Sequence, residues 1–251
     1  MQCVTHGIII RAKSVGDDRL LTILTADYGV ISAAARGANK PRSRLTSSTE
    51  LFCYSKLVLF RYRDSTTVDS AEVEQSFFAL RQNIAALSLA SYIAELCCEL
   101  APPEEAAPDY LRLLLNTLHL LSKGKKSVWQ LKPVFELRLM TMAGFMPDLT
   151  GCAVCGAFDA KENGGPMRFS VETGTLYCSD CDLVEYLAVP ISDGVLAAMR
   201  HILYSPFEKL FAFSLPDEGL RALAQICERY LLHHLQKQYR SLGFFYSVAG
   251  E

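Results

Sequence analysis

The sequence predicts an α+β protein with a small N-terminal β-barrel, a helical bundle after it, and a cysteine-bearing insert within the bundle. Three observations support this class. Short apolar, β-branched segments separated by turn residues occupy the chain up to Ser76, as they do in small barrels. From Phe77 onward the apolar residues recur with the spacing of helix faces,. Between two of these helices lies an irregular, glycine-rich interval that contains four of the nine cysteines.

The N-terminal segment contains five candidate strands. Turn residues such as Asp27, Tyr28 and Gly29 separate them, and five short strands at this spacing favour a closed barrel of the OB type. The longest connection, residues 37–50, falls between the third and fourth strands, where a five-stranded OB barrel holds a helix or a long loop. The predicted strands are Gly7–Lys13, Arg19–Thr25, Val30–Arg36, Leu51–Arg63 and Thr66–Glu74.

Five helices are predicted after the barrel, because apolar residues line one face of each segment. We interpret these stripes as the core of a bundle and not as the lining of a cofactor pocket. The predicted domains are an OB barrel at residues 1–78, a bundle at 79–146 with 191–245, and a metal-binding insert at 147–190. The predicted helices are Leu89–Leu100, Tyr110–Leu121, Val128–Gly144, Ser192–Tyr204 and Asp217–Tyr239.

Charge is distributed unevenly along a chain whose formal net charge is only −2. Residues 1–63 carry ten lysines and arginines against four acidic residues, whereas the remainder carries fifteen against twenty-three. This asymmetry indicates two modules with different partners, and any nucleic-acid surface must come from the basic module. Ordinary fluctuation of surface charge is the alternative.

The start of the chain lacks the charged and apolar regions of a signal peptide. The most apolar stretch, Ile84–Ala94, is shorter than the roughly 20 residues that span a bilayer. We therefore expect a cytoplasmic protein, in which nine cysteines indicate metal binding or free thiols and not disulfides. The cysteines outside the insert, Cys3, Cys53, Cys97, Cys98 and Cys227, are predicted to be small buried hydrophobic residues.

Four cysteines of the insert have the spacing of a metal site. Cys152-Ala-Val-Cys155 is followed after twenty-two residues by Cys178-Ser-Asp-Cys181, and two such knuckles can bring four thiolates into the tetrahedron that zinc accepts. A hairpin of residues 167–171 and 175–177 would connect them. Four thiolates leave no open position for water, so we predict a structural zinc ion. Buried or disulfide-linked cysteines and a redox-active pair are the less favoured alternatives.

Basic residues concentrate in the connection between the third and fourth strands. Four cations within nine residues, together with Gly37 and Pro41, are a composition suited to following a phosphate backbone. A solvated loop without a ligand is the alternative. Tyr54, Phe60 and Tyr62 are either stacking platforms or, as we prefer for most of them, barrel core. The predicted DNA-binding residues are Arg36, Lys40, Arg42 and Arg44 of the loop and Arg11, Lys13, Lys56, Arg61 and Arg63 of the strands.

No catalytic set is recognisable in the sequence. There is no Gly-x-x-x-x-Gly-Lys-Ser/Thr phosphate loop and no Gly-x-Ser-x-Gly elbow,. The five histidines are scattered, and the carboxylates show no pattern of a two-metal nuclease site,. We therefore expect a protein that is not an enzyme and that needs no nucleotide cofactor.

Three stretches of the chain resemble the RecO family. Phe135–Gly156 resembles the junction between helix and zinc site in that family, Ala35–Arg44 resembles its loop after the third barrel strand, and Phe169–Cys178 resembles its segment before the second knuckle. The order of barrel, bundle, insert and bundle also agrees over residues 1–240. The chain departs from the family at residues 46–49, where serine and threonine stand and an apolar pair is expected.

The resemblance implies a bacterial, nucleoid-associated recombination mediator in DNA repair. Such a protein binds single- and double-stranded DNA, anneals complementary strands, and with RecR helps load RecA onto strands coated by single-stranded-DNA-binding protein. It also grips the acidic C-terminal tail of that coating protein, for which Lys132 and Arg138 are our candidates. The loop residues Arg36, Lys40, Arg42 and Arg44 match the basic loop of the family, and the four insert cysteines match its zinc ligands.

Two other classes remain open. One is a zinc-containing adaptor whose barrel binds a peptide and has no direct role on DNA. In that class, charge reversal in the basic loop would leave partner binding intact. The other is a nuclease or nucleotidyl-transfer enzyme with dispersed carboxylates, which a magnesium-dependent change in labelled DNA would reveal.

Overall fold

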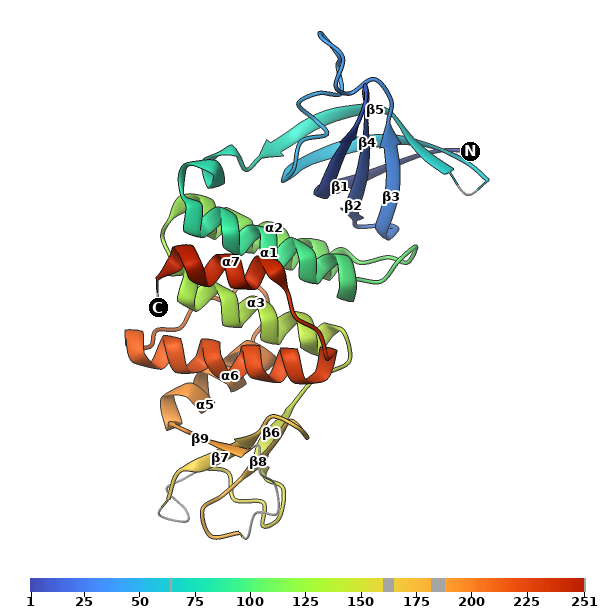
Figure 1. Cartoon of the computed structure of the whole chain (residues 1–251). Coiled ribbons are helices and arrows are strands. Elements are labelled where there is room, and N and C mark those ends of the chain that lie inside the picture. Colours follow the sequence, from blue (N-terminus) through green and yellow to red (C-terminus); the bar gives the residue numbers. More distant parts are fainter. Residues whose placement is uncertain (64, 160–164, 182–187, 251) are drawn as a thin grey trace. The chain divides into compact units, whose positions relative to one another are not determined.

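The computed structural model describes residues 1–63, 65–159, 165–181 and 188–250 (Figure 1). The chain divides into two compact units. Unit 1 comprises Met1–Lys126 together with Tyr239–Glu251, and unit 2 comprises Ser127–Gln238. The α+β class is confirmed, with a five-stranded barrel followed by helices and a cysteine cluster. Among the helices of the described residues, none combines the length and apolar character that crossing a bilayer requires.

Unit 1 begins with a closed barrel in the strand order β1-β2-β3-β5-β4. Neighbouring strands are antiparallel, except that β3 and β5 are parallel at the pair Ala34 and Thr67, which closes the barrel. The connection between β3 and β4, drawn in lighter blue in Figure 1, is a series of turns and contains no helix. The strands are β1 Gln2–Val15, β2 Asp18–Thr25, β3 Gly29–Ala35, β4 Cys53–Tyr62 and β5 Ser65–Ser76. The predicted turn residue Asp64 lies outside the described residues.

The barrel core consists of the inward-facing residues that alternate along each strand, among them Ile9, Ile23 and Leu57,. In β4 the inward set also includes two polar or small residues, Cys53 and Ser55. The residues that alternate with this inward set therefore face outward, and they include the three aromatic residues. Phe60 and Tyr62 are 47% and 59% exposed and Tyr54 is half-buried, so their preferred assignment to the barrel core is wrong.

The remaining elements of unit 1 are helical. They are η1 Phe78–Gln82, α1 Ile84–Leu100, α2 Pro108–Lys123 and α7 Arg240–Ala249. Helix α7 was not predicted; it packs against α1 through Leu242 and Phe245. Hydrogen bonds from Tyr239 to Glu99 and from Ser241 to Glu95 fix it there.

The turn between β2 and β3 lies against the connection between α1 and α2. The Val30 N–H donates to the Pro102 carbonyl oxygen at 3.0 Å. A Cβ atom on Gly29 would lie 2.0 Å from the same oxygen, and Gly29 has a φ of +56°. Both the close approach and the left-handed backbone therefore require glycine at this position.

Unit 2 places a four-stranded sheet beside three helices. The sheet has the order β6-β8-β7-β9. The predicted hairpin is confirmed as β7 and β8, whereas β6 and β9 were not predicted. The elements are α3 Val128–Met142, β6 Asp148–Cys152, β7 Met167–Ser170, β8 Thr175–Tyr177, β9 Ala188–Ile191, α5 Asp193–Tyr204 and α6 Asp217–Leu235.

Helix α6 ends at Leu235, four residues before the predicted end at Tyr239. Gln236 adopts a left-handed backbone with φ 49°, and its N–H donates to the Leu232 carbonyl, which terminates the helix. The chain then returns to unit 1, so α7 lies with the barrel and not with α6. The domain boundaries predicted at 78, 146 and 190 stay predictions.

Candidate metal centre and nucleic-acid interface

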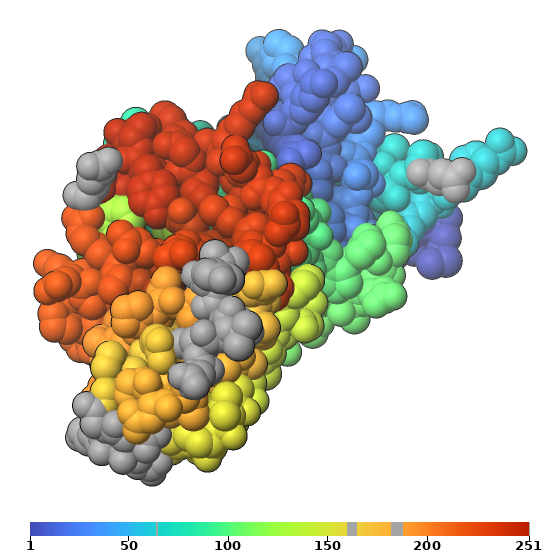
Figure 2. Space-filling view, turned by 60° about the horizontal axis from the view of Figure 1, so that its bottom comes forward, coloured from blue at the N-terminus to red at the C-terminus, as the bar shows by residue number. Residues whose placement is uncertain are grey.

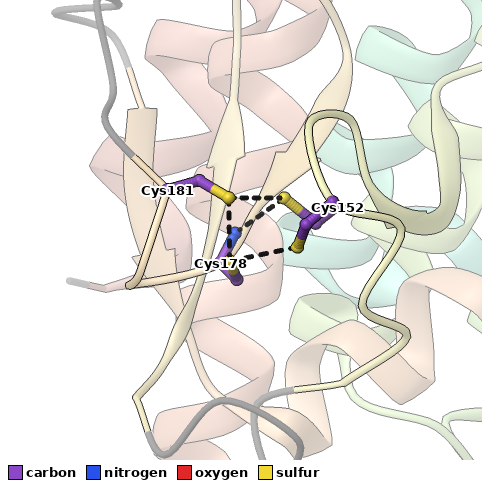
Figure 3. Close-up of side chains that lie close together, drawn as sticks. Cys152, Cys178 and Cys181 are labelled. Atoms are coloured by element: carbon purple, nitrogen blue, oxygen red, sulfur yellow. Dashed lines mark hydrogen bonds between the residues drawn. The ribbon is translucent and has the colours of Figure 1, made fainter.

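The four cysteines of the insert converge in unit 2, and Figure 3 labels three of them, Cys152, Cys178 and Cys181. Their four sulfur atoms all lie within 4.8 Å of one another. The sulfur of Cys178 lies 3.4 Å from that of Cys181 and 3.6 Å from that of Cys155, and the sulfurs of Cys152 and Cys181 are 3.8 Å apart. This is a four-thiol cluster with the composition of a closed tetrahedral zinc site.

Local backbone geometry explains how the two knuckles meet. The first knuckle closes when the Gly156 N–H donates to the Cys152 carbonyl, and Gly156 has a φ of +79°, which glycine adopts without strain. Strand β6, which ends at Cys152, pairs in parallel with β8, and β8 runs directly into Cys178. Figure 2 shows the sheet and its loops at the molecular surface, in yellow and orange.

Hydrogen bonding favours the thiolate at one corner of the cluster. Burial raises the pKa of Cys152, but the N–H groups of Cys155, Cys178 and Val154 donate to its sulfur and lower the pKa to about 6. The pKa of Cys181 is raised, first by its side-chain hydrogen bond with Cys178 and then by burial. A cation at the centre would replace such shared protons, since metal binding deprotonates coordinating thiols.

An arginine from outside the knuckles supports the second one. Arg168, on β7, donates through Nη2 to the carbonyl oxygens of Cys178, Ser179 and Cys181 at 3.2, 3.4 and 3.4 Å. These contacts hold the backbone that carries two of the four sulfurs. Sequence reasoning missed this residue, because its partners lie ten or more positions further along the chain.

A cationic groove lies on the outer face of the barrel. Arg11 pairs with Thr22 across β1 and β2, and Lys13 pairs with Leu20, so these side chains share one face of the sheet. The cations are exposed, and β2 and β3 contribute most of the other lining residues. The volume is about 380 Å³, and the lining residues are Arg11, Lys13, Leu20, Leu21, Thr22, Ser32, Ala33, Ala34, Ser65 and Thr66.

The basic loop, defined as residues 37–50, and the adjoining Arg36 present four exposed cations. Lys40 lies 3.7 Å from the carboxylate of Asp17, and both side chains are mostly exposed, so this pair is weak. Among the described residues no carboxylate forms an ion pair with Arg36, Arg42 or Arg44. These three arginines are therefore available to a ligand with negative charge.

The predicted strand cations differ in their availability. Arg61 is only about 25% exposed, forms an ion pair with Glu104 at 2.9 Å and stacks over Tyr28, so it is engaged within unit 1. Lys56 is exposed but lies on the outer face of β4, and Arg63 lies over the ring of the neighbouring tyrosine. The structure thus brings Arg11 and Lys13 into one groove and leaves Arg61 apart from it.

The two residues predicted to bind an acidic tail have partners inside unit 2. Lys132 is completely buried, and its ammonium contacts Glu136 at 2.9 Å and Glu228 at 2.6 Å. Arg138 donates to the carbonyl oxygens of Ile202 and Leu203 at the end of α5. This enclosure argues against contact of Lys132 with a partner segment.

Comparison with known proteins gives consistent results over nearly the whole chain. The family description "Recombination protein O N terminal" matches residues 1–77, and "Recombination protein O C terminal" matches residues 81–243. A protein of Acetivibrio thermocellus named "DNA repair protein RecO" is 35% identical over 96% of this chain and 94% of its own length. The proteins of the same name from Desulforudis audaxviator and Symbiobacterium thermophilum are 34% and 31% identical, over 97% and 95% of this chain and 96% and 94% of their own lengths.

Proposed function

The chain belongs to the RecO family of DNA repair proteins, and from this membership we propose that it acts as a recombination mediator. In this proposal it binds single- and double-stranded DNA and anneals complementary strands. With RecR it helps load RecA onto strands coated by single-stranded-DNA-binding protein, whose acidic tail it also binds. The proposal assigns it no catalytic step and no nucleotide, and it places the protein in the bacterial cytoplasm at the nucleoid.

The observation that supports DNA binding is the concentration of exposed cations on the barrel. Arg36, Arg42 and Arg44 form no ion pair among the described residues, and Arg11 and Lys13 line the groove. Lysines and arginines that neutralise phosphates release counterions, which drives binding at moderate salt. A phosphate backbone is the ligand that suits a run of arginines beside a groove with two exposed cations.

The four-cysteine cluster supports a structural zinc ion in the same proposal. All four positions of a tetrahedral ion would be filled by protein sulfur, so the ion would cross-link the two knuckles and contribute folding energy. Its chemistry is limited to holding the sheet of unit 2 together. The protein's own groups orient the knuckles: the Cys178 N–H donates to the Cys152 sulfur, and Arg168 donates to the Cys178 carbonyl.

A second candidate function is a zinc-containing interaction adaptor without a direct DNA role. The observation in its favour is the exposed apolar surface on the outer face of β1 and β4, where Val4, Phe60 and Tyr62 are 53%, 47% and 59% exposed. Exposed aromatic residues of this kind are common where a protein partner binds.

Strand annealing measured by fluorescence, with wild type and an Arg42→Glu/Arg44→Glu variant across a salt series, tests the proposal. The loss of two phosphate contacts should also reduce the salt dependence of single-strand binding. The slope of the logarithm of the binding constant against the logarithm of the salt concentration should fall by about 1.4. A Lys123→Glu/Lys125→Glu variant has the same change in net charge at exposed positions outside the barrel and should anneal like wild type. Absence of DNA binding by the wild type at low salt would remove the mediator function and favour the adaptor.

A further inference from the structure

The basic loop is a built structure although it has no regular secondary structure. Successive turns close through N–H donations from Lys40 to Gly37 and from Ser43 to Lys40. The loop also has apolar anchors, because Ala38 is fully buried in the barrel core and Leu45 packs against that core. Ala38 and Leu45 therefore attach the loop to the barrel core, while the loop's cations stay exposed to solvent.

The turn between β1 and β2 supplies the next set of attachments. The Asp18 carboxylate accepts the Gly37 N–H at 2.7 Å, and the Asp17 carbonyl accepts the Asn39 N–H at 2.9 Å. The Asn39 amide then donates to the carbonyl oxygens of Gly16 and Asp18 at 3.1 and 3.0 Å. Asn39 thus makes three hydrogen bonds to one turn.

Arg19, on β2, connects the beginning of the loop to its end. Its Nε donates to the Asn39 side-chain oxygen at 2.8 Å, and its Nη1 donates to the Thr46 carbonyl at 2.8 Å and to the Thr49 hydroxyl at 3.2 Å. Thr49 is completely buried, as is Ser48. Thr46 and Thr49, which belong to the serine and threonine stretch at 46–49 where an apolar pair is expected, therefore hold this arginine.

One loop cation has an unusual backbone. Arg42 has a φ of +65°, a left-handed conformation that is uncommon for a residue with a Cβ atom. Such a conformation persists where the surrounding structure determines it, and it often marks a binding surface. Its persistence here is consistent with a loop that is fixed before a ligand arrives.

We propose that Arg19 and Asn39 are positioning residues, which fix the basic loop against the β1–β2 turn so that Arg36, Arg42 and Arg44 are presented to a phosphate backbone in one conformation. This inference rests on the proposed DNA-binding function. Arg19 and Asn39 do not themselves contact the phosphates. They lower the ordering cost of binding, because a loop that is already ordered loses less conformational entropy when it meets its ligand.

Two variants separate positioning from direct contact. Arg19→Lys keeps the charge but loses the planar fork that reaches three acceptors, and Asn39→Ala removes an uncharged side chain. Each should weaken binding of a single-stranded oligonucleotide about tenfold, because a loop that is no longer fixed must be ordered when it binds. The salt slope should stay at the wild-type value, because the number of phosphate contacts is unchanged. Removal of a direct contact, as in Arg42→Ala, should instead reduce the slope by about 0.7.

Hydrogen exchange of the free protein provides a readout that does not involve DNA. The amides of Gly37, Asn39 and Thr49 should exchange at least tenfold faster in both variants, while the amides of β2 and β3 stay protected. Arg112→Lys, an exposed arginine on α2, is the matched control and should change neither exchange nor affinity. Affinities are compared at a temperature at which every variant is folded.

The possible results distinguish the positioning role of Arg19 and Asn39 from the proposed DNA-binding function. If Arg42→Glu/Arg44→Glu loses DNA binding while Arg19→Lys and Asn39→Ala bind like wild type, the positioning role is wrong and the DNA function stands. A reduced salt slope in Arg19→Lys would also overturn the inference, because it would make Arg19 a contact residue. If the wild type does not bind DNA at low salt, the proposed function and the positioning role both fail.

Discussion

Replacement of Lys132 by methionine should destabilise unit 2 without a direct effect on any partner. The ammonium of Lys132 is completely buried and donates to Glu136, which is 1% exposed, and to Glu228, which is 18% exposed. The variant would leave the two carboxylates without this cation. Breaking a buried ion pair costs about 3–5 kcal/mol, and the partial exposure of Glu228 places the expected loss near the lower end, about 3 kcal/mol.

Urea unfolding followed by tryptophan fluorescence measures this loss directly. Trp129 is the only tryptophan of the chain and lies on α3, three residues before Lys132. With a urea dependence of about 2 kcal/mol per molar, a loss of 3 kcal/mol lowers the unfolding midpoint by about 1.5 M. Lys125→Met, at an exposed position, should change stability by less than about 0.5 kcal/mol.

A second variant tests the cause of the loss. Replacing the whole group, as Lys132→Met/Glu136→Leu/Glu228→Met, removes the buried charges together and should recover most of the stability. The reasoning is refuted if Lys132→Met costs less than about 1 kcal/mol and weakens binding of an acidic peptide, since Lys132 would then be accessible to a partner.

Three further predictions concern the metal site, a turn and a titrating histidine. Purified protein should contain one zinc ion per chain by atomic emission, and Cys152→Ser should lower both zinc content and melting temperature; an unchanged melting temperature with the zinc absent would contradict a structural site. Gly29→Ala should cost about 2–4 kcal/mol, because its Cβ would lie 2.0 Å from a carbonyl oxygen,, whereas Gly16→Ala, with a similar φ of +58° and open space around it, should cost only about 1 kcal/mol; equal losses in thermal unfolding would disprove the steric argument. Burial and the neighbouring His233 lower the pKa of His234 from its ordinary 6.5, so the folded protein favours the neutral ring and stability should fall as the pH drops below about 6.5 through the folded pKa; His234→Gln should flatten this part of the stability curve, and an unchanged curve would exclude His234 as the cause.

The hairpin between the two cysteine knuckles was predictable because its signals are local. The spacing of the four cysteines and the turn at Glu172-Thr173-Gly174 lie within one short segment, and β7 and β8 form there as expected. Strand β6 could not be predicted, because it pairs with β8 in parallel across more than twenty residues. A five-residue strand has little pattern of its own without that partner.

The phase of β4 was not predictable from its composition. Apolar residues occur on both faces of this strand, since Leu57 and Leu59 face inward and Val58 and Phe60 face outward. Alternation fixes the inward face only when one face is clearly polar. The end of α6 was missed for a different reason. Gln236 terminates the helix in a left-handed conformation, and glutamine is not a residue typical of that position,.

The charge and position of the basic loop could be predicted from the sequence, but its conformation could not. Its charges and its place between β3 and β4 were evident from composition, because arginines and turn residues are read directly. Its fixed shape was not, because Arg19 meets Asn39, Thr46 and Thr49 at separations of 20 to 30 residues. Such long-range hydrogen bonds leave no periodic trace in the sequence.

The return of the chain to unit 1 through α7 has a consequence for biosynthesis. The hydrogen bonds from Ser241 to Glu95 and from Tyr239 to Glu99 join residues 146 and 140 positions apart, with all of unit 2 between them. A ribosome that adds about 5–20 residues per second therefore needs roughly 6–22 s to translate residues 127–238 after it has translated α1 and α2. During that interval the face of α1 that receives α7 is uncovered, so nascent chains should depend on chaperones more at this stage than after release.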